Sequence, residues 1–392
     1  MSPPSLSPHG AATFRWLETG AVALDAMLLA MEGAGEAILL EMYIFADDEV
    51  GRRVLSALVA ARARGVRVRV LVDALGSITL PGRFWEPLVE KGGEFRWFNA
   101  FETARRYGYR NHRKLFVADG KVAIIGGFNV SEDYYGDGVR HGWRDLGVEL
   151  RGPVVEALTR TFDDLFARAA ARPEAFFALR RRPDTEVEGE NWRLLLSGPG
   201  RGHHALRRSL ARDLSRARHV RIICAYFAPT RRIRRELRRV VRRGGRVELI
   251  LAGKSDVFLS RLASQSLYSA LMQAGVELYE YAPQILHAKF FIIDEVVYVG
   301  SANLDARSLK LNYELLLRLD DPCAAEEARA IFGRDRERSQ RLLLAGWRAG
   351  RGWWRRLLEK IAYMVVVHLD PYLTRLPWRL RAEETARRFG GR

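Results

Sequence analysis

Two stretches of the chain carry the same order of apolar and polar positions. In the first stretch, the nearly continuous apolar run over residues 37–45 predicts a buried strand. Residues 51–64 follow with helical spacing, and residues 65–73 alternate between apolar and polar positions as a half-buried strand does. The second stretch repeats strand, helix and strand over residues 220–227, 231–243 and 244–252. The chain therefore contains an internal repeat of strand–helix–strand units.

This repeat predicts the fold class and the division of the chain. Strand–helix–strand units of this length favour parallel pairing, with the helices covering the sheet. We expect an α/β protein of two similar halves, each a mostly parallel mixed sheet flanked by helices, packed as a pseudo-two-fold dimer. The pattern places the first half at residues 13–171, a linker at 172–191, the second half at 192–340 and a C-terminal tail at 341–392.

Each copy of the repeat also contains the motif H-x-K-x-x-x-x-D, followed by a turn of small residues and an asparagine. The residues of the first copy are His112, Lys114, Asp119 and Asn129, and those of the second are His287, Lys289, Asp294, Ser301 and Asn303. Because side chains alternate along a strand, the histidine and lysine of each motif point to the same face. Two complete copies at matching points of a repeat argue against chance occurrence.

Paired histidines, lysines and asparagines suit phosphodiester exchange. One imidazole attacks phosphorus and forms a phosphohistidine, while the other donates a proton to the leaving alkoxide. The lysines, the asparagines and Ser301 would hold the non-bridging oxygens, and the scheme needs no metal ion or cofactor. Asp119 and Asp294 complete the catalytic motif but lie on the opposite strand face from the lysines. We expect these two carboxylates to stabilise the turn that follows each strand.

A histidine that attacks or shuttles protons needs its second ring nitrogen fixed by a hydrogen-bonding partner. A carboxylate follows each motif, Asp145 in the first half and Glu314 in the second. These two side chains are the expected partners of His112 and His287, either respectively or crosswise.

The quoted motifs resemble the phospholipase D superfamily and, within it, the shorter B type of bacterial cardiolipin synthases. The resemblance covers nearly the whole chain and rests on residues 111–114, 126–129, 143–145, 286–289 and 300–308. It implies transfer of a phosphatidyl group between two phosphatidylglycerol molecules through a phosphohistidine, with release of glycerol. It also implies His112 as the nucleophile and His287 as the acid and base. Since Gly127 stands where the second motif has Ser301, that assignment stays open.

The charge of the chain indicates a partner that carries phosphate groups. Lysine and arginine number 64 against 47 aspartate and glutamate, which gives a net charge of +17. This field favours either nucleic acid or an anionic membrane surface and does not choose between them. The resemblance favours phosphatidylglycerol, with nucleic acid not expected.

The C-terminal tail offers a second indication of a lipid partner. Trp353 and Trp354 precede two arginines and an apolar run that ends at Leu369 and is too short to span a bilayer. Such a segment is typical of an interfacial helix in the headgroup region, and its alternative is a helix docked on the protein. The N-terminal region shows no export signal, and the apolar stretch 21–45 is interrupted by acidic residues. We therefore expect peripheral attachment to the inner membrane at its cytoplasmic face.

Three other functions are compatible with parts of the sequence. A hydrolytic phospholipase D would use the same residues with water as the acceptor. A nuclease would use the positive charge but has no need of the Trp-rich tail. A membrane-binding scaffold with an inactive site is disfavoured because both motifs are complete.

Overall fold

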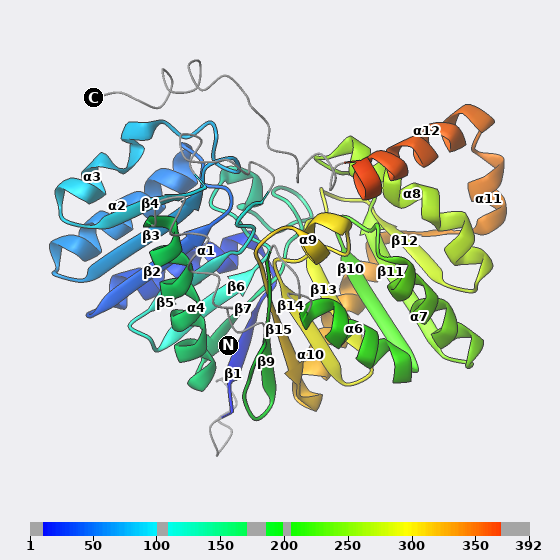
Figure 1. Ribbon diagram of the computed structural model, residues 1–392, viewed down its shortest axis with the longest axis horizontal. Coiled ribbons are helices and arrows are strands. Elements are labelled where there is room, and N and C mark those ends of the chain that lie inside the picture. The colour runs from blue at the N-terminus through cyan, green and yellow to red at the C-terminus, as the bar shows by residue number, and fades with distance from the viewer. Residues whose placement is uncertain (1–10, 100–108, 171–185, 199–204, 370–392) are drawn as a thin grey trace.

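The computed structural model describes residues 11–99, 109–170, 186–198 and 205–369 and contains two α/β halves (Figure 1). Each half is built on one mixed β-sheet with helices packed against it, as the repeat predicts. Most of the predicted linker, residues 172–185, lies outside the described residues, as does residue 171 at the end of the predicted first half. Within the remainder of that linker, a short strand, β8 (Glu186–Glu188), pairs with the second sheet.

The first sheet has the strand order β1-β7-β6-β5-β2-β3-β4. Its strands are β1 (Thr13–Leu17), β2 (Ala37–Met42), β3 (Arg67–Asp73), β4 (Glu94–Phe98), β5 (Leu115–Ala118), β6 (Val122–Gly126) and β7 (Gly147–Arg151). Only the β2–β3 and β3–β4 pairs of this sheet are parallel within the described residues.

The second sheet has the strand order β16-β12-β11-β10-β13-β14-β15-β9-β8. Its other strands are β9 (Trp192–Ser197), β10 (His219–Cys224), β11 (Arg246–Ala252), β12 (Glu277–Tyr281), β13 (Lys289–Ile293), β14 (Val296–Gly300), β15 (Glu314–Asp320) and β16 (Ser339–Leu342). Its parallel pairs are β10–β11 and β11–β12, so β11 occupies the place that β3 has in the first sheet.

The predicted mixed α/β halves are confirmed, but the prediction of mostly parallel pairing is wrong. Antiparallel pairs outnumber parallel ones in both sheets. The motif strands β5 and β13 turn tightly into β6 and β14, and these pair in turn with β7 and β15, again antiparallel. Asp119 and Asp294 sit in these turns with φ values of 52° each, a left-handed conformation that a tight reversal uses. The strand–helix–strand pattern accounts only for the three parallel strands of each half.

The two predicted crossover helices are present as α2 (Glu49–Ala63) and α7 (Arg231–Arg242). Each begins at a side-chain cap, since Asp48 accepts a hydrogen bond from the Gly51 amide and Thr230 accepts one from the Ile233 amide. The other longer helices are α1 (Gly20–Gly33), α4 (Pro153–Ala170), α6 (Ala205–Arg216), α8 (Phe258–Gln273), α10 (Pro322–Glu337) and α12 (Trp353–Met364). Short helical segments are η1 (Gly82–Trp85), α3 (Glu86–Glu90), η2 (Glu132–Tyr134), α9 (Ala306–Lys310), α11 (Leu344–Ala349) and η3 (Val365–Leu369).

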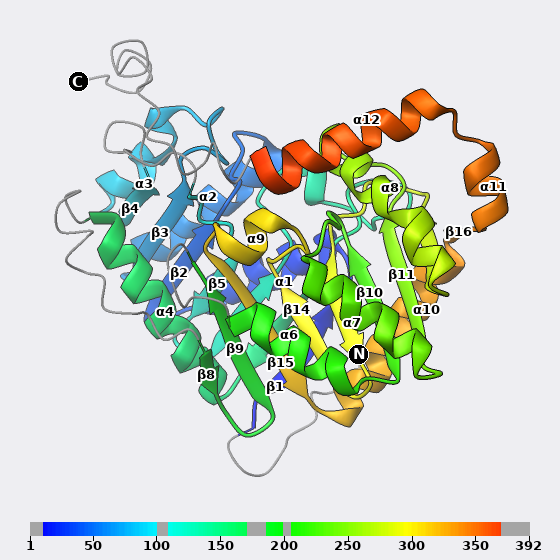
Figure 2. The same cartoon turned by 45° about the vertical axis from the view of Figure 1, so that its right-hand side comes forward.

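One hydrophobic core joins the two halves. It contains Leu39, Val117 and Val148 of the first sheet together with Phe290 and Val297 of the second. The rings of Trp16 and Phe290 meet edge to face across the junction, with centroids 5.3 Å apart. The halves are therefore packed against each other by buried apolar side chains, and Figure 2 shows β1 of the first half lying close to the strands of the second.

Candidate active site

The backbone of each motif pairs with a segment of the opposite half. An isolated parallel bridge joins Asn111 to Tyr313, and a second one joins Leu286 to Arg144. The amide of His112 donates to the carbonyl of Tyr313 at 2.9 Å, and the amide of His287 donates to the carbonyl of Arg144 at 2.8 Å. Both histidines precede their strands β5 and β13 rather than lying within them. The two motifs consequently meet at one junction between the halves.

The side-chain partners of the histidines are crosswise. His112 Nδ1 lies 2.9 Å from Glu314 Oε2, and His287 Nδ1 lies 2.6 Å from Asp145 Oδ2. All four side chains are buried. Of the two pairings that the sequence leaves open, the structure has the one in which each half supplies the carboxylate for the other's imidazole. A bond at Nδ1 leaves Nε2 of each ring as the nitrogen for attack or proton transfer.

The two lysines lie on the same side as the histidines. Lys114 Nζ donates to the carbonyl of His112 at 2.6 Å, and Lys289 Nζ donates to the carbonyl of His287 and lies 2.8 Å from His287 Nδ1. Both ammonium groups are buried. The H-x-K spacing thus gathers one imidazole and one ammonium on each side of the junction.

Burial dominates the ionisation of these four groups. Removal from water lowers the pKa of Lys114 to about 7, against the attraction of Glu314, and lowers the pKa of His112 to about 4. It also lowers the pKa of His287 and of Lys289 below their ordinary values. The Lys289 ammonium further lowers the pKa of both His112 and Lys114, although they belong to the other half. The titratable groups of the two halves therefore influence one another's ionisation across the junction.

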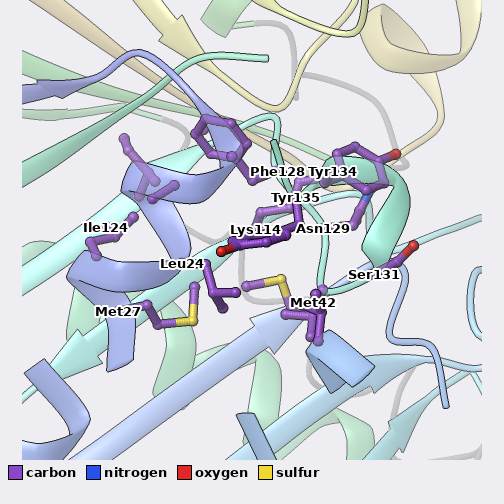
Figure 3. A pocket seen from close by; sticks show the side chains of 16 residues that line it. Leu24, Met27, Met42, Lys114, Ile124, Phe128, Asn129, Ser131, Tyr134 and Tyr135 are labelled. Atoms are coloured by element: carbon purple, nitrogen blue, oxygen red, sulfur yellow. The ribbon is translucent and has the colours of Figure 1, made fainter. Parts of the chain in front are cut away.

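Figure 3 shows why Lys114 is poorly solvated. Its side chain lines a pocket whose other walls are largely apolar and come from α1, β2 and β6. Leu24, Met27, Met42 and Ile124 line the same pocket, and so does Asn129, which follows β6 in the chain. The ammonium donates to the His112 carbonyl, but burial outweighs the attraction of Glu314 and disfavours the charged form.

Asn129 and Asn303 occupy matching positions after β6 and β14. The amide oxygen of Asn129 accepts a hydrogen bond from the Ile44 amide at 3.0 Å, and that of Asn303 accepts one from the Tyr226 amide at 3.3 Å. These bonds fix the orientation of both side chains next to the motif strands. Each asparagine then has its NH₂ group to offer as a donor.

Ser301, predicted to hold a phosphate oxygen, contacts the carboxylate partner of His112. Its hydroxyl donates to Glu314 Oε2 at 2.6 Å and accepts from the Leu315 amide at 3.0 Å, so it orients this carboxylate. The matching position, Gly127, has no room for a side chain, because a Cβ there would lie 2.1 Å from Asp145 Oδ1. Asp145 is shorter than Glu314, and it occupies at Gly127 the space that the Ser301 hydroxyl occupies in the other half.

Asp119 and Asp294 do not join this group of residues. Asp119 accepts hydrogen bonds from the amides of Gly35, Glu36 and Ala37 at 3.0, 2.8 and 2.9 Å. Asp294 accepts from the amides of Arg218 and His219 at 3.1 and 2.7 Å. These contacts lie at the far end of β5 and β13 from the histidines and hold each turn against the start of β2 or β10.

A buried polar network supports the first motif and was not found from the sequence. Asn111 Nδ2 donates to Glu41 Oε1 at 2.8 Å, and the Asn111 amide donates to Asp73 Oδ2 at 2.8 Å. Glu41 also pairs with Arg113 at 3.1 Å. The second motif has Leu286 and Ala288 where the first has Asn111 and Arg113. The signal in the sequence is the single glutamate in an otherwise apolar strand.

Aromatic rings surround the histidines and were also missed. The Tyr43 ring lies 4.8 Å from the His112 ring, and the rings of Tyr134 and Trp143 lie 5.1 and 5.6 Å from that of His287. Trp143 belongs to the segment 143–145 that carries the family resemblance, but its position beside His287 was not predicted. Tyr43 and Tyr134 lie outside the motifs, so no spacing in the sequence marks them. Apolar ring faces around the imidazoles exclude water from the reacting nitrogens.

The chain resembles proteins of known family. The family model described as "Cardiolipin synthase, PLD-like domain" matches residues 27–165 and 210–336, one segment in each half. Cardiolipin synthase B of Escherichia coli K12 is 31% identical over 375 residues, which cover 92% of this chain and 89% of that protein. Cardiolipin synthase 1 of Bacillus cereus is 32% identical over 336 residues, and the aligned region covers 82% of this chain but 66% of that longer relative.

The fold also matches a solved structure. Phosphatidylserine synthase of Haemophilus influenzae Rd KW20 superimposes with a TM-score of 0.73 at 15% sequence identity, covering 92% of this chain and 94% of that one. At this identity the likeness concerns the arrangement of the two halves and their sheets.

Proposed function

Because the chain belongs to the cardiolipin synthase family of phospholipase D-like proteins, we propose that it transfers a phosphatidyl group between two phosphatidylglycerol molecules and releases glycerol. The observation that carries the proposal is the crosswise pairing of His112 with Glu314 and of His287 with Asp145. It provides two oriented imidazoles and two ammonium groups at one junction, which is the set that a double displacement at phosphorus needs.

In the first step the phosphodiester lies between the Lys114 and Lys289 ammonium groups. Its negative charge offsets the repulsion between them and raises the pKa of the nearby imidazoles, which allows one of them to be protonated. His112 Nε2 attacks phosphorus, and the bond from phosphorus to the oxygen of the headgroup glycerol breaks, so the phosphatidyl group stays on the histidine. The leaving alkoxide takes its proton from His287, and Glu314 stabilises the positive charge that develops on His112.

In the second step the headgroup hydroxyl of another phosphatidylglycerol attacks the phosphohistidine. His287, now neutral, removes the proton of that hydroxyl, while Asp145 stabilises the resulting imidazolium. The phosphorus–nitrogen bond breaks, His112 is restored, and cardiolipin leaves. The resemblance to the family assigns the attack to His112, and Asn129 and Asn303 donate to the non-bridging oxygens as charge builds up on them.

The lipid substrate is supported by helix α12. It packs on α8 through Ala362, which contacts Leu262 and Ala263. Tyr363 is partly buried against the same helix, whereas the remaining large apolar side chains of α12 are exposed, namely Trp353, Trp354, Leu357, Leu358, Ile361 and Met364. Within the described residues no helix is both long and apolar enough to cross a bilayer. We propose that α12 lies in the headgroup region and attaches the protein peripherally to an anionic membrane.

The test is product analysis with purified protein and labelled phosphatidylglycerol in mixed micelles. Cardiolipin and glycerol are the expected products. Phosphatidic acid without cardiolipin would establish the hydrolase instead, and cleaved DNA with unreacted lipid would establish the nuclease.

Two substitutions test the paired histidines. His112→Ala and His287→Ala each remove one half of the double displacement, so each is expected to lower turnover by about three orders of magnitude or more. The matched control is His219→Ala, since His219 is an exposed histidine at the far end of β10. Substantial turnover by either motif variant would contradict the scheme.

A further inference from the structure

We propose that two loops beside the site insert into the acyl layer of an anionic phospholipid bilayer and hold the mouth of the site against it. These rim loops are residues 75–78, which follow β3, and residues 257–259, which follow β11 and begin α8. The inference rests on the proposed function, because it concerns how the same site reaches a membrane lipid.

The rim loops occupy equivalent places in the two halves. β3 lies between two parallel neighbours in the first sheet, and β11 lies between two parallel neighbours in the second. The motif strands β5 and β13 begin opposite the carboxyl ends of β2 and β10. Loops that leave the carboxyl ends of β3 and β11 therefore emerge at the edge of the sheets where the histidines lie.

A short series of contacts connects each rim loop to one histidine. Ser77 donates to the carbonyl of Tyr43 at 3.2 Å, and the Tyr43 ring lies 4.8 Å from that of His112. In the second half, Asp256 accepts hydrogen bonds from the Tyr226 hydroxyl at 2.6 and 2.7 Å, and the Tyr226 ring lies 6.5 Å from that of His287. One residue, Tyr43, connects the first loop to His112, and two residues, Asp256 and Tyr226, connect the second loop to His287.

Both loops expose apolar side chains. Ile78 is 50% exposed and Phe258 is 68% exposed, and Leu75, Val257 and Leu259 are also exposed. One exposed apolar residue needs no explanation, but matched groups on both sides of a site indicate a binding surface. Isoleucine, leucine and phenylalanine at the tips of two loops are suited to partition among acyl chains.

The surface continues into α12 and carries positive charge. α8 begins at Phe258 and packs against α12, and both views show these two helices side by side (Figures 1 and 2). Arg234 lies over the ring of Tyr363, which joins the start of α7 to α12. The exposed cations of these two helices include Arg231, Arg232, Arg355, Arg356 and Lys360. Apolar tips next to exposed cations are complementary to an anionic bilayer rather than to a second copy of this basic chain.

Insertion of both rim loops has a consequence for the chemistry. The site lies between the loops, so the bilayer would present a phosphodiester to the histidines at headgroup depth. The donor and acceptor lipids then keep their acyl chains in the membrane throughout the reaction. Neither chain has to be transferred to water.

Vesicle sedimentation tests this arrangement with Ile78→Glu and Phe258→Glu. We expect each variant to bind phosphatidylglycerol vesicles about tenfold more weakly than the unchanged protein, since a charged tip cannot enter the acyl layer. Leu29→Glu is the matched control. Leu29 is 69% exposed but lies near the end of α1 that leads to the Asp119 turn, at the opposite edge of the sheet from His112.

Activity on monomeric short-chain phosphatidylglycerol separates binding from catalysis. Both rim variants are expected to keep this activity and to lose activity on vesicles. Unchanged vesicle binding of both variants would overturn the inference. It would also be overturned if gel filtration showed that the substitutions weaken only the association of the protein with itself and not its binding to vesicles. If the unchanged protein makes no cardiolipin from either form of substrate, the proposed function fails, while the sedimentation result still decides the membrane surface.

Discussion

At the scale of single residues, Lys114 is a buried side chain of the site whose charge changes near neutrality. Burial lowers its pKa to about 7, so the ammonium form is lost as the pH rises through that value. We expect kcat/KM to fall above about pH 7, because a neutral amine no longer holds the phosphodiester. The pKa of His112, about 4, keeps that imidazole neutral and nucleophilic over the whole range.

The measurement is kcat/KM against pH with phosphatidylglycerol in mixed micelles. Lys114→Arg is the informative variant, since a guanidinium stays charged at every pH of the assay. Its residual activity is expected to lack the decline near neutrality. A flat profile from about pH 6 to about pH 9 in the unchanged protein would show that Lys114 does not titrate in this range.

The pair Gly127 and Ser301 provides a second prediction at the residue scale. Gly127→Ala places a Cβ where the Asp145 carboxylate lies, so His287 loses its alignment. We expect kcat to fall by about a hundredfold, the usual effect of a displacement of about 1 Å at a reacting group. Ser301→Ala removes one hydrogen bond to Glu314 and is expected to lower kcat by about tenfold.

Steady-state kinetics on micelles compare the two variants, with KM as the control for substrate binding. Each substitution acts through a carboxylate, so KM is expected to change little. A larger loss from Ser301→Ala than from Gly127→Ala would contradict the crowding at Gly127.

At the scale of elements, the turn that follows β5 contains Asp119, a residue of the catalytic motif whose contacts are structural. The Asp119 carboxylate accepts three backbone hydrogen bonds from residues 35–37 and has a φ of 52°. Asp119→Ala loses these bonds and places a residue that disfavours this conformation in the turn. We expect it to lower the free energy of unfolding by about 1–3 kcal/mol. Chemical denaturation provides the measurement.

Asp119→Asn is the matched control for that loss. Asparagine tolerates positive φ and keeps a side-chain oxygen for the same amides, so its effect is expected to be smaller. The folded fraction of both variants should retain its turnover per molecule, because the turn lies away from the histidines. A folded Asp119→Ala protein without turnover would place Asp119 in the chemistry.

The sequence predicts these elements to very different degrees. The strand–helix–strand units and the two motifs follow from local patterns, since alternation and spacing determine which face each side chain occupies. The antiparallel hairpins that follow β5 and β13 were missed, because the tight turns at Asp119 and Asp294 depend on φ values that the spacing does not reveal. The crosswise partners could not be decided either, because they depend on how the halves pack.

For the whole molecule, the junction between the halves determines the geometry of the site. The shared hydrophobic core holds the two sheets together but does not set the position of any single imidazole. That position comes from polar contacts across the junction, such as the His287 amide with the Arg144 carbonyl. Displacement of one half relative to the other would separate each histidine from its carboxylate.

One of these polar contacts is a buried ion pair that joins Arg144 of the first half to Asp335 in α10 of the second. Arg144 Nε and NH2 each lie 2.8 Å from an oxygen of Asp335, and both side chains are buried. Asp335→Ala leaves a buried guanidinium without its carboxylate, so we expect a loss of about 3–5 kcal/mol in the free energy of unfolding. Because Arg144 adjoins Asp145 and holds the His287 amide, kcat is expected to fall as well.

A second ion pair between α10 and the first half is the control. Arg334 and Glu18 also connect the two halves, but both side chains are about half exposed to water. Arg334→Ala is therefore expected to change stability by less than about 1 kcal/mol and to leave kcat unchanged. Chemical denaturation gives the free energy of unfolding of both variants, and steady-state kinetics give kcat. Larger losses for Asp335→Ala than for Arg334→Ala are expected if the buried pair stabilises the junction. Equal losses from the two substitutions would contradict the role of the Arg144–Asp335 pair in positioning His287.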